Sequence, residues 1–270
     1  MPAIRDLRRR HSAAISTRLN RGFDRVVVVA HVALPGKYHP YFLTEDIAAA
    51  GFILMGFALE AVSGQIVGWK HALAMGVTFL LYSLVYLKIK RSVTGVGARS
   101  ALQDSLLFVF PAYVGLSWAW GQPFAPTLDA LGLSILWAIG WMRLGCFLSG
   151  CCHGRPSRIG VRYPTTALRS VAGWRIYTCP PDPGRRVFPL PLIESAAVFL
   201  LFVVLWWLHG SAHAPTDGKI LALAVIGYCV WRFIAEHFRG HRHRPRYLGV
   251  SEAQILAIVL TGIAVIGLIG

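Results

Sequence analysis

The sequence predicts an all-α, polytopic integral membrane protein with about seven transmembrane helices and a basic extramembrane cap segment. Of its 270 residues, 55% are hydrophobic and only 14% are charged, whereas soluble domains carry about 25% charged residues. Apolar stretches long enough to cross a bilayer recur along the chain, and none alternates with the period of two typical of outer-membrane strands. This composition excludes both a soluble domain and a disordered chain.

Residues 1–45 are interpreted as a basic N-terminal leader. Its first part, residues 1–22, is rich in arginine, and the apolar stretch Arg25–Leu34 that follows is too short to span a bilayer. We therefore expect an interfacial helix whose basic residues face lipid headgroups. No cleavable signal peptide is expected, because no apolar core is followed by a small-residue cleavage site.

The remaining residues, 46–270, form a single predicted transmembrane domain. Its expected spans are residues 46–64, 68–87, 104–121, 128–149, 191–209, 219–238 and 250–269. The long connection 151–190 is rich in Gly, Pro and Arg. Connections of this length are often functional, so we expect it to form the cap segment at the membrane surface.

The formal net charge of +15 comes mostly from arginine, which outnumbers lysine 22 to 5. No soluble basic domain is visible, so anionic membrane lipids, and no nucleic acid, are the expected partners. Basic residues gather in the segments 88–100, 151–190 and 239–248, while the alternate loops contain none. By the positive-inside rule, the basic loops and the N-terminus are predicted to be cytoplasmic and the C-terminus to lie outside.

The segment WMRLGCFLSGCCHGR, residues 141–155, ends the fourth predicted span and places Arg143 inside an apolar helix. Gly145, Ser149 and Gly154 are small, so a substrate could approach the backbone closely there. An arginine with small neighbours at a helix end suits a bidentate contact with phosphate. The alternative is an arginine that snorkels toward the membrane surface.

A second charged segment, WRFIAEHFRG, places Arg232, Glu236 and Arg239 at positions i, i+4 and i+7, which share one helical face. A glutamate between two arginines can orient their guanidinium planes and leave donors for an anion. A structural ion pair that holds helices together is the alternative.

Glu194 opens the fifth predicted span. We expect it to pair with Arg143 or with an arginine near residue 239, or to orient a polar substrate headgroup. An acidic residue near a helix start also interacts favourably with the helix dipole, which is the alternative explanation.

Cys146, Cys151, Cys152 and His153 offer thiolate and imidazole groups that suit zinc. Adjacent cysteines rarely both bind one ion, and no second Cys-x-x-Cys motif lies elsewhere. Packing of small residues is therefore favoured, with metal binding and redox chemistry as alternatives. His153 is also a candidate general base near the arginines.

Four segments, in this order, resemble the prolipoprotein diacylglyceryl transferase family. The family signature G-R-x-G-N-F-x-N-x-E-x-x-G corresponds to WMRLGCFLSGCCHG, which keeps Arg143, Gly145, Phe147 and Gly154. The other three segments are PLIE (191–194), YCVWRFIAEHFRG (228–240) and GVSEAQIL (249–256). The resemblance covers about residues 128–270, and four elements in register make it specific.

The resemblance implies transfer of the diacylglyceryl moiety of phosphatidylglycerol, or of a similar anionic glycerophospholipid, to the lipobox cysteine of a prolipoprotein. Glycerol phosphate is released, and the enzyme lies in the bacterial plasma or inner membrane. No cofactor or metal is needed, because the thiolate is the nucleophile and the phosphate leaves. The expected catalytic residues are Arg143, Arg232, Glu236 and His153, and the expected substrate-binding residues are Arg239, Glu194, Gly145, Gly154 and Ser149.

The sequence departs from the family at several positions. Cys146 and Ser149 stand where the signature has asparagine, and Cys151 stands where it has glutamate. The family also carries a His-Gly-Gly stretch on an earlier helix, whose histidine is a candidate base. Here His71 is followed by Ala-Leu, and FPAYVG (110–115) has no histidine.

The family acts on the outer leaflet, opposite to the side that the loop charges predict for residues 151–190, so either the topology follows the family or this member works on the cytoplasmic leaflet. The missing histidine motif and the altered signature leave one alternative function open, a related enzyme with a different lipid or small-molecule acceptor. Others are a non-catalytic protein that binds anionic lipids and a thiol redox protein that uses Cys151 and Cys152.

Overall fold

A computed structural model describes residues 2–33, 40–64, 66–94, 108–163, 184–211, 218–240, 246–247 and 249–269. Helices make up most of these residues, as predicted. The helices are α1 (Pro2–Ala33), α2 (Pro40–Ser63), α3 (Gly68–Leu81), the π-helix η1 (Tyr82–Tyr86), α4 (Leu87–Thr94), α6 (Phe110–Ala119), α7 (Phe124–Ser149), α8 (Leu190–His209), α9 (Lys219–Glu236) and α10 (Glu252–Ile269). The strands are β1 (Pro156–Val161), β2 (Arg246–Tyr247) and β3 (Val250–Ser251), of which β2 and β3 pair antiparallel.

Four helices in the described part of the chain are long and apolar enough to cross a membrane. They comprise Leu43–Ser63, Phe124–Ser149, Leu190–His209 and Glu252–Ile269. Among the other predicted spans, α3 has 14 residues and α6 has 10, whereas α9 contains three charged residues. The protein is thus a helical membrane protein, with four candidate spans in the described part of the chain.

Helix α7 is the longest of these spans and its ends are marked by local signals. At its start, the Thr127 hydroxyl donates to the Pro123 carbonyl over 2.7 Å. At its end, Gly150 adopts a left-handed conformation with φ of 76°, and the Cys151 amide donates to the Cys146 carbonyl. Glycine is favoured at this position because it lacks a Cβ, so the helix stops where the sequence predicted.

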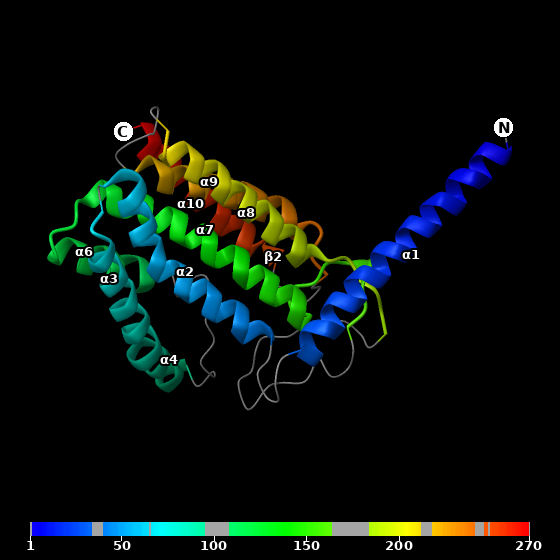
Figure 1. Ribbon diagram of the computed structural model, residues 1–270, viewed down its shortest axis with the longest axis horizontal. Helices are drawn as coiled ribbons and strands as arrows, with labels where there is room; N and C mark the ends of the chain where they lie inside the picture. The colour runs from blue at the N-terminus through cyan, green and yellow to red at the C-terminus, as the bar shows by residue number, and fades with distance from the viewer. Residues whose placement is uncertain are drawn as a thin grey trace.

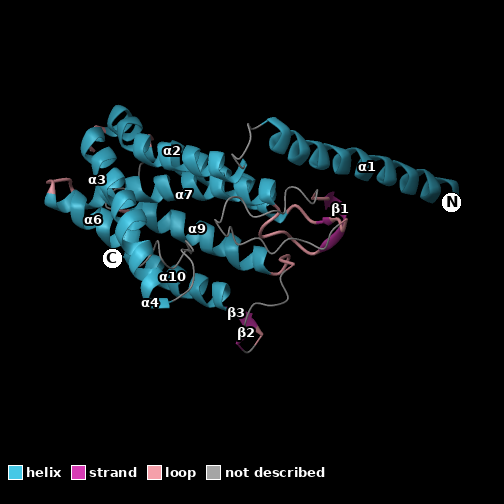
Figure 2. Ribbon diagram, turned by 90° about the horizontal axis from the view of Figure 1, so that it is seen from below, coloured by secondary structure: helices cyan, strands magenta, loops and turns pink. Residues whose placement is uncertain are grey.

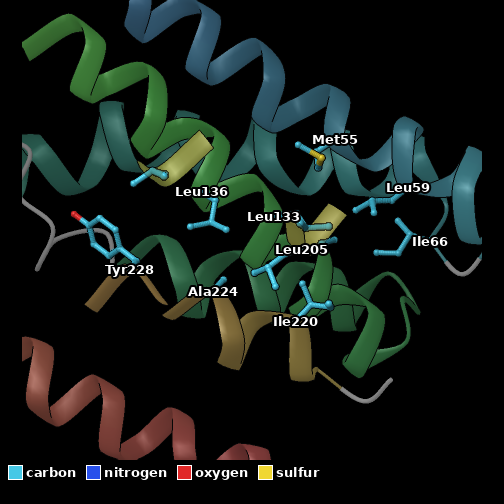
Figure 3. Packing of buried hydrophobic residues seen from close by; sticks show 11 residues of the cluster. Met55, Leu59, Ile66, Leu133, Leu136, Leu205, Ile220, Ala224 and Tyr228 are labelled. Atoms are coloured by element: carbon cyan, nitrogen blue, oxygen red, sulfur yellow. The ribbon is translucent and has the colours of Figure 1, made fainter. Parts of the chain in front are cut away.

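The helices α2, α8 and α9 pack around α7, and α10 packs on α9 (Figure 1). The main hydrophobic core lies between them and includes Met55 of α2, Leu133 of α7, Leu205 of α8 and Ile220 of α9 (Figure 3). On the outer surface, large apolar side chains are exposed on α8 and α10. Such a surface is what a lipid-facing helix requires. Examples are Leu200, Val203, Trp207, Ile258, Ile263 and Ile266.

Helix α1 projects away from the bundle and contacts it through its C-terminal half (Figures 1 and 2). Asn20 bonds the backbone of β1 in both directions, to the Arg158 carbonyl over 3.0 Å and from the Gly160 amide over 2.9 Å. Asp24 accepts from Arg186 at 2.7 Å. The helix runs from Pro2 to Ala33. It thus includes the arginine-rich residues as well as most of the stretch Arg25–Leu34, for which the sequence analysis expected an interfacial helix. The division of the chain at residue 45 stays a prediction.

The described parts of the two basic segments, 151–190 and 239–248, lie at the same end of the bundle. Gly154 forms a β-bridge with Arg239, and its amide donates to the Phe188 carbonyl over 3.0 Å. A Cβ on Gly154 would lie 2.9 Å from that carbonyl oxygen, so only glycine permits this approach. The end of α7, the start of α8 and the end of α9 are therefore held together.

Replacing Gly132 by alanine is expected to lower the free energy of unfolding by about 1–3 kcal/mol. A Cβ there would lie 2.8 Å from the Leu221 Cα, so α7 and α9 would have to move apart. Gly76 of α3 is a matched control, because a Cβ there meets nothing within 4 Å. Gly76→Ala should keep or raise the thermal midpoint in detergent. Equal midpoints for the two variants would contradict the described packing of α7 on α9.

Candidate active site

Five ionisable side chains meet where the ends of α7, α8 and α9 converge. We call this group the arginine–glutamate cluster. α7 supplies one arginine near its end, α8 supplies a glutamate near its start, and the rest come from the end of α9 and the residues after it. The members are Arg143, Glu194, Arg232, Glu236 and Arg239. The structure thus brings together all five charged residues that the sequence analysis singled out from three separate segments.

Glu194 lies at the centre of the cluster and is only 1% exposed. Nη2 of Arg239 donates to both of its carboxylate oxygens, at 3.0 and 3.1 Å. Its oxygens also lie 3.6 Å from Nε of Arg143 and 3.7 Å from Nη1 of Arg232. One carboxylate therefore contacts all three guanidinium groups, where the sequence analysis expected it to pair with one.

Glu236 contacts two of the same arginines. Its Oε2 lies 2.9 Å from Nη1 of Arg232, one helical turn earlier, and 3.6 Å from Nε of Arg239. Arg232 and Glu236 thus share one face of α9, as their i, i+4 spacing predicted, whereas Arg239 lies beyond the end of the helix and contacts Glu236 from there. Three arginines and two glutamates leave the cluster with one excess positive charge.

Tyr228 is a member of this site that the sequence analysis missed. Nη2 of Arg143 donates to its hydroxyl over 3.2 Å. Tyr228 lies four residues before Arg232 on α9 and therefore shares a helical face with it. That spacing was the signal in the sequence, since an aromatic hydroxyl on a charged face can bind an arginine.

The small residues of the signature pack within the protein. The Ser149 hydroxyl donates to the Gly145 carbonyl over 2.9 Å and lies 3.4 Å from Sγ of Cys151. Gly154 allows the close contact with Phe188 described above. These contacts give Ser149 and Gly154 structural roles. The expected participation of Gly145, Ser149 and Gly154 in substrate binding stays a prediction.

His153 is buried beside the turn that follows α9. Its backbone carbonyl accepts from the Gly240 amide over 3.1 Å, one residue beyond Arg239. Its Nδ1 lies 2.9 Å from the Gly154 carbonyl oxygen, so Nδ1 carries the proton in that contact. In a neutral ring the basic lone pair is then on Nε2.

His71, the other histidine weighed as a candidate base, does not lie near the arginine–glutamate cluster. His71 is fully buried on α3, and its Nδ1 lies 2.7 Å from the hydroxyl of Tyr113 in the FPAYVG segment. Tyr113 packs in a cluster with Leu131, which lies on α7 about 18 Å along the helix from Arg143. His71 is therefore remote from the arginine–glutamate cluster.

The three cysteines of the signature form a thiol cluster. The sulfur atoms of Cys146, Cys151 and Cys152 all lie within 4.8 Å of one another. Cys146 and Cys151 are buried, and Cys152 is partly buried. The sequence spacing gave no sign of such close approach. Cys179 lies outside the described residues.

The thiols of this cluster differ in acidity. Hydrogen bonds from Cys146 and Cys151 hold the pKa of the Cys152 thiol well below its ordinary value. The charges of Arg143 and Arg239 lower that pKa further. The hydrogen bond from Cys146 also lowers the pKa of Cys151, but its bond with Cys152 and its burial outweigh this effect and raise it to about 12. Cys152 is thus the member of the cluster that favours the thiolate form.

Comparisons with known proteins agree on one family. The family model described as prolipoprotein diacylglyceryl transferase matches residues 101–270. The phosphatidylglycerol–prolipoprotein diacylglyceryl transferase of Clostridium tetani is 33% identical over 141 residues, which are 51% of each chain. A second such transferase, from Clostridium perfringens, is 29% identical over 129 residues, or 47% of this chain and 45% of the relative.

The chain spans about half the length of the curated relatives that it matches. The residues that the family model matches include every member of the arginine–glutamate cluster and the two basic segments 151–190 and 239–248. Since the family model covers more than half of the chain, the protein belongs to the prolipoprotein diacylglyceryl transferase family.

Proposed function

We propose that this protein transfers the diacylglyceryl moiety of phosphatidylglycerol, or of a similar anionic glycerophospholipid, to the cysteine thiol of a prolipoprotein lipobox. Glycerol phosphate is the other product, and the reaction takes place in the bacterial inner membrane. Family membership and the names of the relatives support the proposal. The structural observation that carries it is the arginine–glutamate cluster, since the lipid substrate has a phosphate to be bound.

Two features of the cluster favour an anionic ligand. Its excess positive charge is buried, and an arginine can bind phosphate through two parallel hydrogen bonds. In addition, Nε of Arg239 is buried and makes no hydrogen bond within the described part of the chain, where the Oε2 of Glu236 lies 3.6 Å away. Buried donors normally have an acceptor. A phosphate oxygen of the lipid would supply one.

The chemistry follows from this placement. The acceptor thiolate attacks the glycerol carbon of the diacylglyceryl group that bears the phosphate ester. A carbon–sulfur bond forms while the carbon–oxygen bond breaks, and glycerol phosphate leaves with the bonding electron pair. Arg143, Arg232 and Arg239 stabilise the negative charge on the leaving phosphate. Glu194 and Glu236 hold the guanidinium groups in position.

We propose that His153 removes the proton from the acceptor thiol. Its Nε2 carries the basic lone pair in the neutral ring, and its backbone is bonded to Gly240 beside Arg239. A histidine at this position replaces the His-Gly-Gly motif that the sequence lacks. This role makes His153 the general base of the transfer.

We also propose that seven helices cross the membrane, with residues 151–190 as the cap. Helix α9 fits this proposal despite its charges, because Arg232 and Glu236 are only 6% and 5% exposed. Their charges face the cluster and not the lipid. Charged residues within spanning helices are tolerated when they pair with one another in the bundle interior.

Purified protein in detergent, given phosphatidylglycerol and a synthetic lipobox peptide, should form glycerol phosphate and lipidated peptide in equal amounts. Mass spectrometry of the peptide and an enzymatic assay of glycerol phosphate measure both products. A peptide whose lipobox cysteine is replaced by serine serves as the control. Glycerol phosphate without lipidated peptide would show a different acceptor, and lipid binding without either product would show a non-catalytic protein.

Arg143→Ala and Arg232→Ala should each lower turnover at least on the order of 100-fold, because each removes a donor that stabilises the departing phosphate. Arg158→Ala is the matched control, since the Arg158 side chain is exposed on β1. That variant should keep the wild-type rate, and all three proteins should insert into the membrane. Near-full activity of either cluster variant would disprove the assignment of the phosphate site.

Glu194→Gln should be more harmful than Glu236→Gln, because Glu194 contacts three arginines and Glu236 contacts two. Loss of one partner from a buried ion pair costs about 3–5 kcal/mol. Thermal midpoints in detergent, compared at matched expression, measure the difference. The opposite order of midpoints would show that Glu194 is not the central carboxylate of the cluster.

A further inference from the structure

The thiol cluster is the feature of the described structure that the proposed transfer does not use. The transferred group goes to a cysteine of the acceptor protein, so the three thiols of Cys146, Cys151 and Cys152 need another explanation. They come from two elements: Cys146 is on the last turns of α7, and the other two lie in the turn after it. All three sulfur atoms lie within 4.8 Å of one another.

The backbone explains why adjacent cysteines can point to one place here. Gly150 and Cys152 both adopt left-handed conformations, with φ of 76° and 55°. The chain therefore folds back on the end of α7, and the Cys151 amide bonds the Cys146 carbonyl over 3.1 Å. Cys152 is the sole residue other than glycine with positive φ in the described part of the chain. Such a conformation costs of order 1–3 kcal/mol and persists where surrounding contacts impose it.

The spacing of the sulfur atoms suits a metal ion. A metal bonded to three sulfurs at about 2.3 Å in a trigonal plane places them about 4.0 Å apart. The observed limit of 4.8 Å is close to that value. Sulfur donors select soft ions such as Cu(I) over hard ones. Among the described residues no histidine, aspartate or glutamate joins the group, so it lacks the fourth ligand that zinc prefers.

The surroundings favour bound thiolates. Arg143 and Arg239 act electrostatically on Cys152, and the arginine–glutamate cluster to which they belong keeps one excess positive charge after its ion pairs are counted. That charge offsets part of the negative charge that a tris-thiolate site would carry. The Ser149 hydroxyl, which donates to the Gly145 carbonyl, lies 3.4 Å from Sγ of Cys151. Contacts of this kind, made by groups that are not ligands, orient the ligands of metal sites.

We propose that Cys146, Cys151 and Cys152 form a three-coordinate binding site for a soft, thiophilic metal ion, with Cu(I) as its preferred occupant. Each thiol that binds releases its proton to solvent. The site lies in the wall of the phosphate site, beside Arg143 and Arg239, and is distinct from it.

The test is an anaerobic titration of the reduced, detergent-purified protein with Cu(I) in competition with the chromogenic chelator bicinchoninate. One Cu(I) per chain is expected. Cys146→Ser, Cys151→Ser and Cys152→Ser should each weaken binding on the order of 100-fold, since each removes one of three ligands. A Cys179→Ser/Cys229→Ser protein, whose only thiols are the three of the cluster, should bind as the wild type does.

X-ray absorption on the Cu(I)-loaded protein gives a second readout that needs no variant to fold. Three sulfur neighbours at about 2.3 Å are expected. Failure to take Cu(I) from the chelator, or wild-type affinity in Cys152→Ser, would overturn the proposal. So would loss of binding in the Cys179→Ser/Cys229→Ser protein. A fall from five to three free thiols on air oxidation, without Cu(I) uptake by the reduced protein, would instead show a disulfide pair.

Discussion

The carboxylate of Glu194, shared by three arginines, is the interaction on which the rest of the structure depends. It is buried at the point where α7, α8 and α9 meet. It contacts the guanidinium groups of Arg143 from α7, Arg232 from α9 and Arg239 from the residues after α9. Three cations without this carboxylate would be a large unfavourable charge in an apolar bundle. The same contacts therefore hold the helix ends together and arrange the groups that we propose bind phosphate.

Short backbone contacts between the cap and the end of α9 complete this arrangement. The Arg155 amide donates to the Phe238 carbonyl and the Gly240 amide donates to the His153 carbonyl, so the two chain segments run together past Arg239. The position of His153 relative to the arginines follows from this pairing. The arginines of the cluster, the proposed base and the thiol cluster are consequently parts of one packed unit.

Local patterns in the sequence predicted much of this. Hydropathy indicated the spans in α2, α7, α8 and α10, and helical spacing placed Arg232 and Glu236 on one face of α9. Contacts between distant segments could not be predicted from local sequence patterns. The sharing of Glu194 depends on how three helices meet, and the thiol cluster depends on a left-handed cysteine that no spacing rule indicates. The bonds that tie Asn20 and Asp24 of α1 to Gly160 and Arg186 are likewise contacts between distant segments.

The shared carboxylate has a consequence for evolution. In a simple ion pair, two substitutions can exchange the positions of the acidic and the basic residue, because the charges still balance. Reversal of the pair between Glu194 and one arginine would leave two other arginines facing a new cation. The cluster can therefore change only as a whole, whereas neighbouring uncharged positions are free of this constraint. Cys146 and Ser149, where the family signature has uncharged asparagine, are such positions. Substitutions there, including the one that supplies the thiol of Cys146, leave the charge balance of the arginine–glutamate cluster unchanged.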